Sequence, residues 1–247
     1  DGIYILLKEV VDNAVDEFIM GAGKKIDVKV DDDGRVSVRD YGRGIPLGKL
    51  VDCVSTINTG AKYNNDVFQF SVGLNGVGTK AVNALSEEFK VVAYRDEKYA
   101  EATFSRGKLL KEKKGKAPKQ SDGTYVEFLP DEEIFGEYAY NTEYVDRRMW
   151  NYACLNSGLT LIYNKQKFVT KNGLLEFLGR EVGDTAIYEP AYHRAQYMEF
   201  AFTHTSNYGE TYYSFVNGQH TSDGGTHQSA FREGILKGIN EFFKKNY

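Results

Sequence analysis

The first segment of the chain has the pattern of one helix with an apolar side and a separate polar side. On helical spacing an apolar band forms a core-facing side, made of Ile3, Leu6, Leu7, Val10, Val11, Ala14, Val15, Phe18 and Ile19. Glu9, Asn13 and Asp16 recur at intervals that place them together on another side of the helix over residues 3–20. A solvated face is the ordinary explanation for such acids. Asn13 weakens it, because Ala, Lys or Glu fills a surface helix position better.

Length and composition indicate a globular protein with a real core. The 247 residues suffice for one large domain or two ordinary ones, and 41% are hydrophobic, 14% aromatic and 27% charged. A net charge of −4 gives no global attraction to nucleic acid or an anionic membrane. No apolar run approaches the roughly 18 residues of a membrane span and no signal peptide opens the chain, so we expect no membrane partner and a cytoplasmic location. Because the sequence starts without Met, in DGIYILL, we expect a fragment.

Cysteine and histidine spacing argues against a structural metal or a disulfide framework. Cys53 and Cys154 are isolated, which is typical of free thiols in a reducing compartment. The four histidines lack HExxH or paired CxxC spacing, so no zinc site is predicted.

Periodicity and turn residues predict alternating helices and strands. Helices are expected over residues 3–20, 48–57, 76–86, 142–156 and 224–247, and strands over 25–30, 35–40, 89–96, 100–105, 123–130, 159–164 and 166–170. A further hairpin is expected to pair residues 198–206 with 211–220 around NYGE. Residues 58–75 read as a long loop, which inside a domain is usually functional or mobile. A domain boundary is placed near residue 172.

Six lysines crowd the segment between two predicted strands: Lys108, Lys111, Lys113, Lys114, Lys116 and Lys119. A basic patch for DNA is one interpretation, and a solvated hairpin is the favoured one.

The glycine run GLNGVGTK, residues 73–80, resembles two phosphate-binding motifs without matching either. A Walker A loop needs Lys before Ser or Thr, and here Thr79 precedes Lys80. The spacing also differs from a dinucleotide fingerprint, which must follow a strand. Glycines that open a helix still let the backbone and its free N–H groups approach a phosphate. The alternative is a plain flexible loop.

The segment RDYGRGIP, residues 39–46, places one carboxylate at a strand end. An ionised Asp40 accepts hydrogen bonds only, so it suits an amino group such as the exocyclic amine of adenine. Gly42 and Gly44 would let a flat base lie against the backbone, and Thr124 offers a hydroxyl at the head of another strand. Alone, each of these segments is an ordinary turn.

Taken in order, these segments resemble the ATPase domain of the GHKL superfamily, which includes gyrase, Hsp90, histidine kinases and MutL. EVVDNAVDE, DYGRGIP, GLNGVGTKAVNALS and FVNGQHTSDGGTH are similar to the B subunits of bacterial type II topoisomerases, and the resemblance runs over residues 3–247. The detail SVGLNGVGTK favours topoisomerase IV over gyrase. The resemblance implies an α+β fold, a two-layer α/β sandwich of the GHKL (Bergerat) type over residues 1–172, followed by part of a transducer domain over 173–247.

The resemblance also implies roles for single residues. Glu9 matches the general base, Asn13 the Mg²⁺ ligand, and Asp40 the adenine-binding carboxylate, which Thr124 and Gly44 reach through ordered water. Asp16 is expected at the pocket edge. The other residues expected to bind ATP lie at the pocket mouth, in the lid or around the phosphates: Arg43, Ile45, Pro46, Lys62, Gly73, Leu74, Asn75, Gly76, Val77, Gly78 and Thr79. The chain departs from the family pattern at Asn75, where many relatives carry His, and at Val72, where many carry Gly.

The implied function is Mg²⁺-dependent ATP hydrolysis that drives DNA strand passage together with a topoisomerase A subunit. The resemblance implies a homodimer on ATP binding in the full-length protein and a monomeric fragment. It places a dimerising arm before residue 1 and a γ-phosphate-binding lysine after residue 247. Three alternatives stay open: the gyrase B subunit, a MutL- or Hsp90-like member, which the GGTH segment disfavours, and a nucleotide switch without hydrolysis, which Glu9 disfavours.

Overall fold

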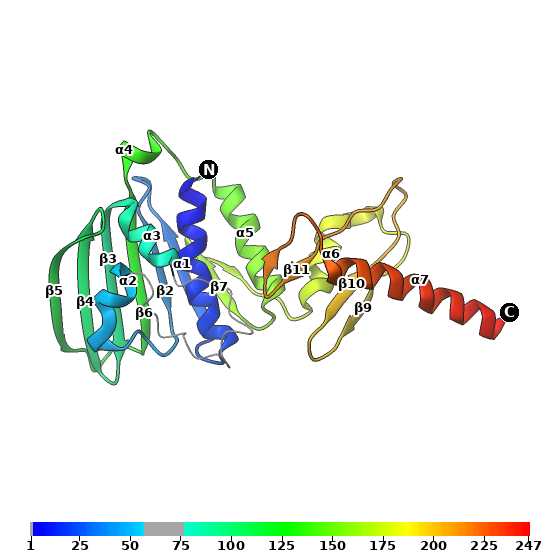
Figure 1. Ribbon diagram of the computed structural model, residues 1–247, viewed down its shortest axis with the longest axis horizontal. Coiled ribbons are helices and arrows are strands. Elements are labelled where there is room, and N and C mark those ends of the chain that lie inside the picture. The colour runs from blue at the N-terminus through cyan, green and yellow to red at the C-terminus, as the bar shows by residue number, and fades with distance from the viewer. Residues whose placement is uncertain (1, 57–76) are drawn as a thin grey trace. The chain divides into compact units, whose positions relative to one another are not determined.

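The computed structural model describes residues 2–56 and 77–247, and the chain divides into two units, one ending at Thr205 and one spanning Ser206–Tyr247. The elements of the first unit are shown in Figure 1: α1 (Gly2–Ile19), β1 (Lys25–Val30), β2 (Val36–Asp40), η1 (Leu47–Lys49), α2 (Leu50–Ser55), α3 (Gly78–Ala84), β3 (Ser86–Arg95), β4 (Lys98–Ser105), β5 (Lys108–Lys116), β6 (Gly123–Pro130), α4 (Glu132–Phe135), α5 (Thr142–Leu155), β7 (Thr160–Tyr163), β8 (Gln166–Phe168), α6 (Gly173–Val182), η2 (Gly183–Thr185), β9 (Ala191–Arg194) and β10 (Glu199–Phe202). The expected loop over 58–75 lies outside the described residues.

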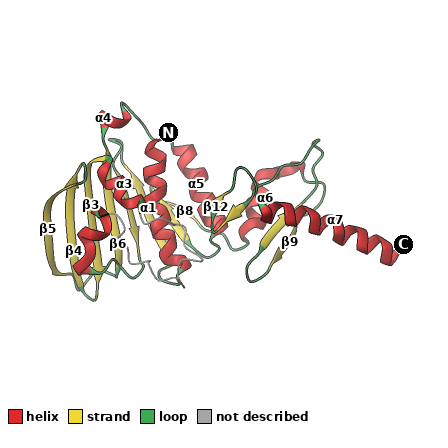
Figure 2. Cartoon of the chain, viewed as in Figure 1, coloured by secondary structure: helices red, strands yellow, loops and turns green. Residues whose placement is uncertain are grey.

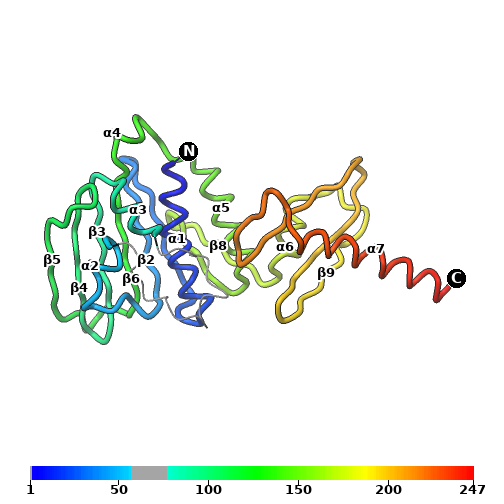
Figure 3. The backbone as a smooth tube through the Cα atoms, in the orientation of Figure 1, coloured from blue at the N-terminus to red at the C-terminus, as the bar shows by residue number. Residues whose placement is uncertain are grey.

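A mixed sheet of eight strands organises this unit, in the order β5-β4-β3-β6-β2-β1-β7-β8. Neighbouring strands are antiparallel except β1 and β7, which pair in parallel. The strands β2 and β6 are distant in sequence but lie side by side (Figure 3), with Arg39 opposite Tyr125. This pairing brings the end of β2, at Asp40, next to the start of β6, at Gly123.

Helices cover one face of the sheet (Figure 2), and the core lies between the two layers. The helix α1 buries the predicted apolar band, with Leu7, Val11 and Val15 almost inaccessible, against sheet residues such as Phe89 and Phe128. Full burial of one such side chain stabilises the fold by about 1.5–3 kcal/mol. The α+β two-layer prediction is confirmed.

Helix boundaries agree closely with the periodicity. The expected helices over 3–20 and 142–156 are Gly2–Ile19 and Thr142–Leu155. The chain leaves α1 through Gly21, whose φ of 81° is the left-handed conformation expected of a helix C-cap. Of the expected helix over 48–57, the described part up to residue 56 is a short 3-10 turn followed by α2 rather than one helix.

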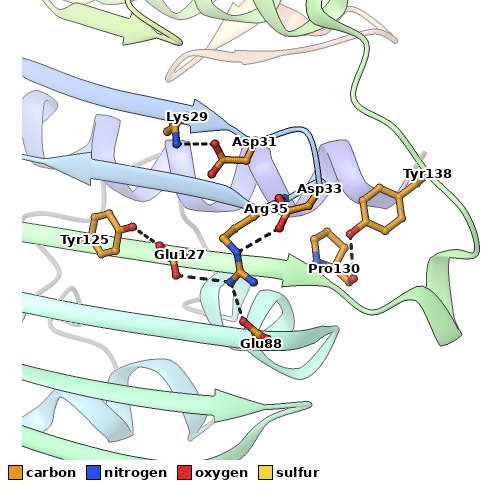
Figure 4. Close-up of polar contacts among 9 residues, drawn as sticks. All are labelled: Lys29, Asp31, Asp33, Arg35, Glu88, Tyr125, Glu127, Pro130 and Tyr138. Carbon is orange, nitrogen blue, oxygen red and sulfur yellow. Dashed lines mark hydrogen bonds and ion pairs between the residues drawn. The ribbon is translucent and has the colours of Figure 1, made fainter.

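The other face of the sheet is polar, as in an antiparallel sheet that packs on one side only. Arg35 lies across this face (Figure 4), with its Nη1 atom 2.8 Å from Glu88 Oε2 and 3.6 Å from Glu127 Oε1. The Tyr125 hydroxyl donates to the same Glu127. Ion pairs of this kind on a solvated face contribute little stability, and they mark which side chains of β2, β3 and β6 face away from the helices.

The lysine-rich segment forms the edge strand β5, which pairs with β4 in a hairpin and is exposed along nearly its whole length. The favoured interpretation, a solvated hairpin, is confirmed. Lysines on an edge strand oppose pairing with another chain, which is sufficient reason for their presence there.

The predicted hairpin between residues 198–206 and 211–220 is wrong. Within the first unit β10 pairs with β9 instead, with Phe200 opposite His193. In the second unit, β11 (Phe215–Val216) pairs with β12 (Gln219–His220). The turn between them has positive φ at both Asn217 (48°) and Gly218 (77°), the requirement of a two-residue type I′ hairpin that Asn-Gly favours. The Asn-Gly turn therefore determines the hairpin in this region, rather than a longer pairing around NYGE.

The second unit ends in α7 (Thr226–Asn246), close to the expected C-terminal helix. No helix within residues 2–56 and 77–247 combines the length and apolarity needed to cross a membrane.

Candidate functional site

The carboxylate of Asp40 lies at the end of β2, where the structure holds it through its neighbours' backbone. Its Oδ1 atom accepts hydrogen bonds from the N–H of Gly42 (2.9 Å) and the N–H of Thr124 (3.1 Å). The residue is only 7% exposed. Within the described part of the chain Oδ2 accepts no hydrogen bond, so it is available to a ligand's donor.

Burial governs the titration of this carboxyl group. It raises the pKa of Asp40 to about 6, although the two backbone N–H groups oppose the shift. The contribution of Asp40 to folding stability is therefore fully present below its ordinary pKa of 3.8 and is lost as the pH rises through about 6. At neutral pH the group is ionised at a cost to stability, which is typical of a carboxylate kept for function.

The conformation of the loop after Asp40 depends on Gly44 and on contacts between Arg43 and Glu17. Gly44 has φ +72°, and a Cβ there would lie 2.5 Å from the carbonyl oxygen of Tyr94, so the loop requires glycine. The Arg43 guanidinium pairs with Glu17 of α1, with Nη2 3.0 Å from Oε1. The backbone N–H of Arg43 donates to Oε2 of the same Glu17 at 2.9 Å. Ile45 packs against the core. The loop is thus fastened to the C-terminal end of α1.

The polar stripe of α1 faces the start of α3 rather than solvent alone. The Asn13 amide nitrogen donates to the Glu9 carbonyl and to the Thr79 hydroxyl, both at 2.8 Å. A Cβ added to Gly78 would collide with the Glu9 carboxylate, so that carboxylate lies directly against the first turn of α3. With its nitrogen engaged, Asn13 has its amide oxygen as the group that remains to bind a ligand.

Glu9 is partly buried, and burial raises its pKa; Asp12 adds to the shift and Lys8 opposes it. A carboxylate with a raised pKa is a stronger base, which suits proton abstraction near neutral pH.

Two further acids of α1, Asp12 and Asp16, are buried. Asp12 accepts from the Tyr152 hydroxyl (2.6 Å) and pairs with Lys8 (2.5 Å), so it connects α1 with α5. Asp16 is fully buried, and its predicted place at a pocket edge stays a prediction.

The structure brings together Glu9, Asn13, Gly78 and Thr79 beside the middle of α1, and Asp40, Arg43, Gly44 and the Thr124 backbone toward its C-terminal end. From Glu9 to Glu17 the helix rises about 12 Å, which is the scale of a nucleoside triphosphate. Pro46 precedes η1, and Val77 caps α3 and is 40% exposed. The predicted residues Lys62, Gly73, Leu74, Asn75 and Gly76 lie outside the described residues.

Sequence reasoning missed two side chains, Glu17 and Arg39, and the role of the Gly42 backbone N–H. Glu17, which clamps Arg43, lies one turn after Asn13, and that spacing could have revealed it. The Gly42 N–H that binds Asp40 and the guanidinium of Arg39, which donates to the Asp40 carbonyl, depend on the folded loop and had no signal in the sequence.

Two family models match the chain. The model of the histidine kinase-, DNA gyrase B- and HSP90-like ATPases matches residues 1–134, more than half of the chain. The chain belongs to this ATPase family. A second model, described as DNA gyrase B, matches residues 168–247.

Individual relatives of this ATPase family refine the assignment. The chain is 60% identical, over its whole length, to the B subunit of DNA topoisomerase 4 from Borreliella burgdorferi, and 33% identical to the B subunit of DNA gyrase from the same organism. The 43K ATPase domain of Thermus thermophilus gyrase B, solved with an aminocoumarin, matches with a TM-score of 0.76 and 32% identity over 97% of this chain and 67% of that one.

These matches make the chain the ATPase region of a type II topoisomerase B subunit, with the topoisomerase 4 type favoured. The family and the fold predicted from the sequence are both confirmed. The chain spans 41% of the length of the Borreliella topoisomerase 4 relative, so the activity of a whole subunit is a matter for proposal.

Proposed function

We propose that this chain binds Mg²⁺-ATP along α1 and hydrolyses it, within a topoisomerase IV B subunit that drives DNA strand passage. One observation carries the proposal. Asp40, a buried acceptor suited to adenine, occurs in the same domain as the Glu9 carboxylate and the Asn13 amide, which lie along the helix α1.

The adenine end rests on the free Oδ2 of Asp40. An ionised carboxylate accepts from the exocyclic amine of adenine, whereas guanine presents an acceptor at the equivalent position. The positive φ of Gly44 and the bond from the Thr124 N–H to Oδ1 keep the loop and the carboxylate in place for this contact.

The metal end rests on Asn13. Its amide nitrogen donates to Glu9 and Thr79, which leaves the amide oxygen as the group that would bind the ion. In the described residues no cluster of His, Cys, Asp or Glu could hold a metal alone, which fits an ion bound mainly by phosphates and water with one protein oxygen. Asn13 would hold Mg²⁺, which would supply positive charge to the phosphates, and the helix start at Gly78 would present N–H groups to the same phosphates.

The hydrolytic end rests on Glu9, which would orient a water and take its proton as the terminal phosphate is attacked. In phosphoryl transfer the protein chiefly positions groups and stabilises charge, so one base, one metal ligand and a ring of backbone amides suffice. Lys62 and residues 73–79 complete the phosphate contacts in this proposal.

The proposal extends to the complete enzyme. It includes a topoisomerase A subunit and DNA as partners, a homodimer that closes on ATP, and the bacterial cytoplasm as the location. The ATPase domain would span residues 1–172 and the transducer domain would start at 173, where α6 begins.

Strand-passage assays test the function. The full-length protein, combined with its A partner, is expected to decatenate linked DNA circles in the presence of ATP and to introduce no negative supercoils. Supercoiling would indicate gyrase, and the absence of any ATP-dependent strand passage would contradict the proposal.

Affinity for ATP is expected to fall about tenfold between pH 7 and pH 5, because Asp40 must be ionised to accept from adenine. The pKa of about 6 places the change in this window. Calorimetry with a non-hydrolysable ATP analogue measures it, and Asp40→Asn is the control, since it keeps the titration of the phosphates but lacks that of the carboxyl. An equal pH dependence in both proteins would remove Asp40 from the base-binding role.

Gly78→Ala is expected to lower turnover more than tenfold, the scale of a misplaced catalytic base, with a smaller change in ATP affinity. The new methyl group would displace the Glu9 carboxylate, which is the mobile end of a side chain, so the fold is retained. Gly48→Ala is the matched control, because nothing lies within 4 Å of its added Cβ. Phosphate-release kinetics compare the two, and equal rates would show that Glu9 does not act from its present position.

A further inference from the structure

We propose that Arg39 is a positioning residue of the ATP site: it ties the end of β2 to the start of β6 and so holds Asp40 in its adenine-accepting geometry. The inference rests on the proposed function, which it deepens by naming what fixes the specificity-determining carboxylate.

The guanidinium of Arg39 joins backbone groups of both strand ends. Its Nη1 atom donates to the Asp40 carbonyl at 2.5 Å, and Nη2 donates to the Ser121 carbonyl at 2.6 Å and to the Asp122 carbonyl at 3.4 Å. A planar fork of donors can reach carbonyls on two segments at once, which a lysine ammonium on a flexible stem does less well.

This bridge sets the position of a donor to Asp40. The chain that Arg39 holds at Ser121 and Asp122 continues through Gly123 to Thr124, whose N–H binds Asp40 Oδ1 at 3.1 Å. Gly123 has φ +130°, and a Cβ there would collide with both the Asp40 carbonyl and Arg39. The close approach of the two strand ends therefore depends on glycine at 123 and on the arginine beside it.

Aromatic rings fix the orientation of the arginine. Its Cζ atom lies 4.8 Å from the ring centroid of Tyr41 and 4.8 Å from that of Tyr94. The Tyr41 hydroxyl donates to Asp27 at 2.6 Å, which holds that ring in turn. Stacking on two rings restricts the guanidinium to the geometry that binds the three carbonyls.

Arg39 also acts through its charge. Burial is the main influence on the Asp40 pKa, Glu17 of α1 raises it further, and Arg39 lowers it. Removing the positive charge should therefore favour the protonated carboxyl. Because Oδ1 accepts from Gly42 and Thr124, the proton would lie on Oδ2, which would then donate rather than accept from adenine.

Two variants of Arg39 separate the bridge from the charge. Arg39→Gln removes both, so we expect roughly ten- to hundred-fold weaker binding of a non-hydrolysable ATP analogue and a pH midpoint of binding shifted upward. Arg39→Lys keeps the charge but loses the bridge. We therefore expect weaker binding of the ATP analogue, with the same pH midpoint of binding as in the unmodified protein. In both, kcat should change less than KM, because the γ-phosphate end of the site is untouched.

Arg35→Gln is the matched control. Arg35 lies on the same polar face of the sheet, but its partners are the side chains of Glu88 and Glu127 (Figure 4). It is expected to leave ATP affinity and the pH midpoint unchanged, and thermal unfolding of all variants monitors the fold.

Unchanged affinity and midpoint in Arg39→Gln, with ATP binding intact in the unmodified protein, would overturn the inference and leave the proposed function standing. If Arg39→Gln does not fold, Arg39→Lys decides, and normal affinity in it would overturn the bridging role. If the unmodified protein binds no ATP, the proposed function fails and the inference with it.

Discussion

Replacing Glu9 by glutamine will lower ATP turnover by roughly 10²–10⁴-fold, the usual effect of losing a general base, and will leave ATP affinity nearly unchanged. The side chain keeps its size against the first turn of α3, so the packing beside Gly78 is retained. Glutamine cannot accept a proton at neutral pH, whereas burial raises the pKa of Glu9 and makes its carboxylate the stronger base. Only the rate of the hydrolytic step, which needs removal of a proton, should fall.

Steady-state phosphate release by the full-length protein measures the rate, and binding of a non-hydrolysable analogue measures the affinity. Glu112→Gln makes the same chemical change on the exposed edge strand β5 and should leave both values unaltered. A Glu9→Gln protein that turns over ATP at the normal rate would show that another group is the base.

Asp40→Asn is expected to weaken ATP binding by about 1–3 kcal/mol, the cost of a buried polar group left without its partner, which is roughly a 5- to 150-fold loss of affinity. Asparagine can keep the bonds from Gly42 and Thr124 at one atom. Its amide nitrogen would then replace Oδ2 and meet the adenine amine donor to donor. The same nitrogen suits the acceptor that guanine presents, so discrimination against GTP should relax.

Competition between ATP and GTP for the purified protein measures both effects. Thermal unfolding at pH 7 controls for the fold, and no loss is expected, because Asp40 is ionised there at a cost that asparagine avoids. Normal ATP affinity together with an unchanged preference for ATP would remove Asp40 from the recognition of the base.

The sequence was most informative for the local pattern of α1. The spacing of Glu9 and Asn13 on one helix side and the apolar band beside them predicted how α1 is used, and the structure places Asn13 against Thr79. The meeting of Asp40 with Thr124 depends on β2 pairing with β6, which joins residues far apart in the chain and has no local pattern. Here the resemblance to a family supplied what spacing could not.

Other features of the structure were not predicted from the sequence. The role of Arg39 arises from a glycine with positive φ and two rings that only the fold brings together. The predicted pairing of residues 198–206 with 211–220 around NYGE left out the local Asn-Gly turn signal at Asn217 and Gly218, which forms the hairpin of β11 and β12.

A crystal structure of the chain with Mg²⁺ and a non-hydrolysable ATP analogue tests the central claim most directly. The account predicts the exocyclic amine of adenine at hydrogen-bond distance from Asp40 Oδ2, the Asn13 amide oxygen on the metal ion, and the Glu9 carboxylate facing the terminal phosphate. A nucleotide bound elsewhere, or bound with its base away from Asp40 and its phosphates away from Glu9 and Asn13, would contradict it.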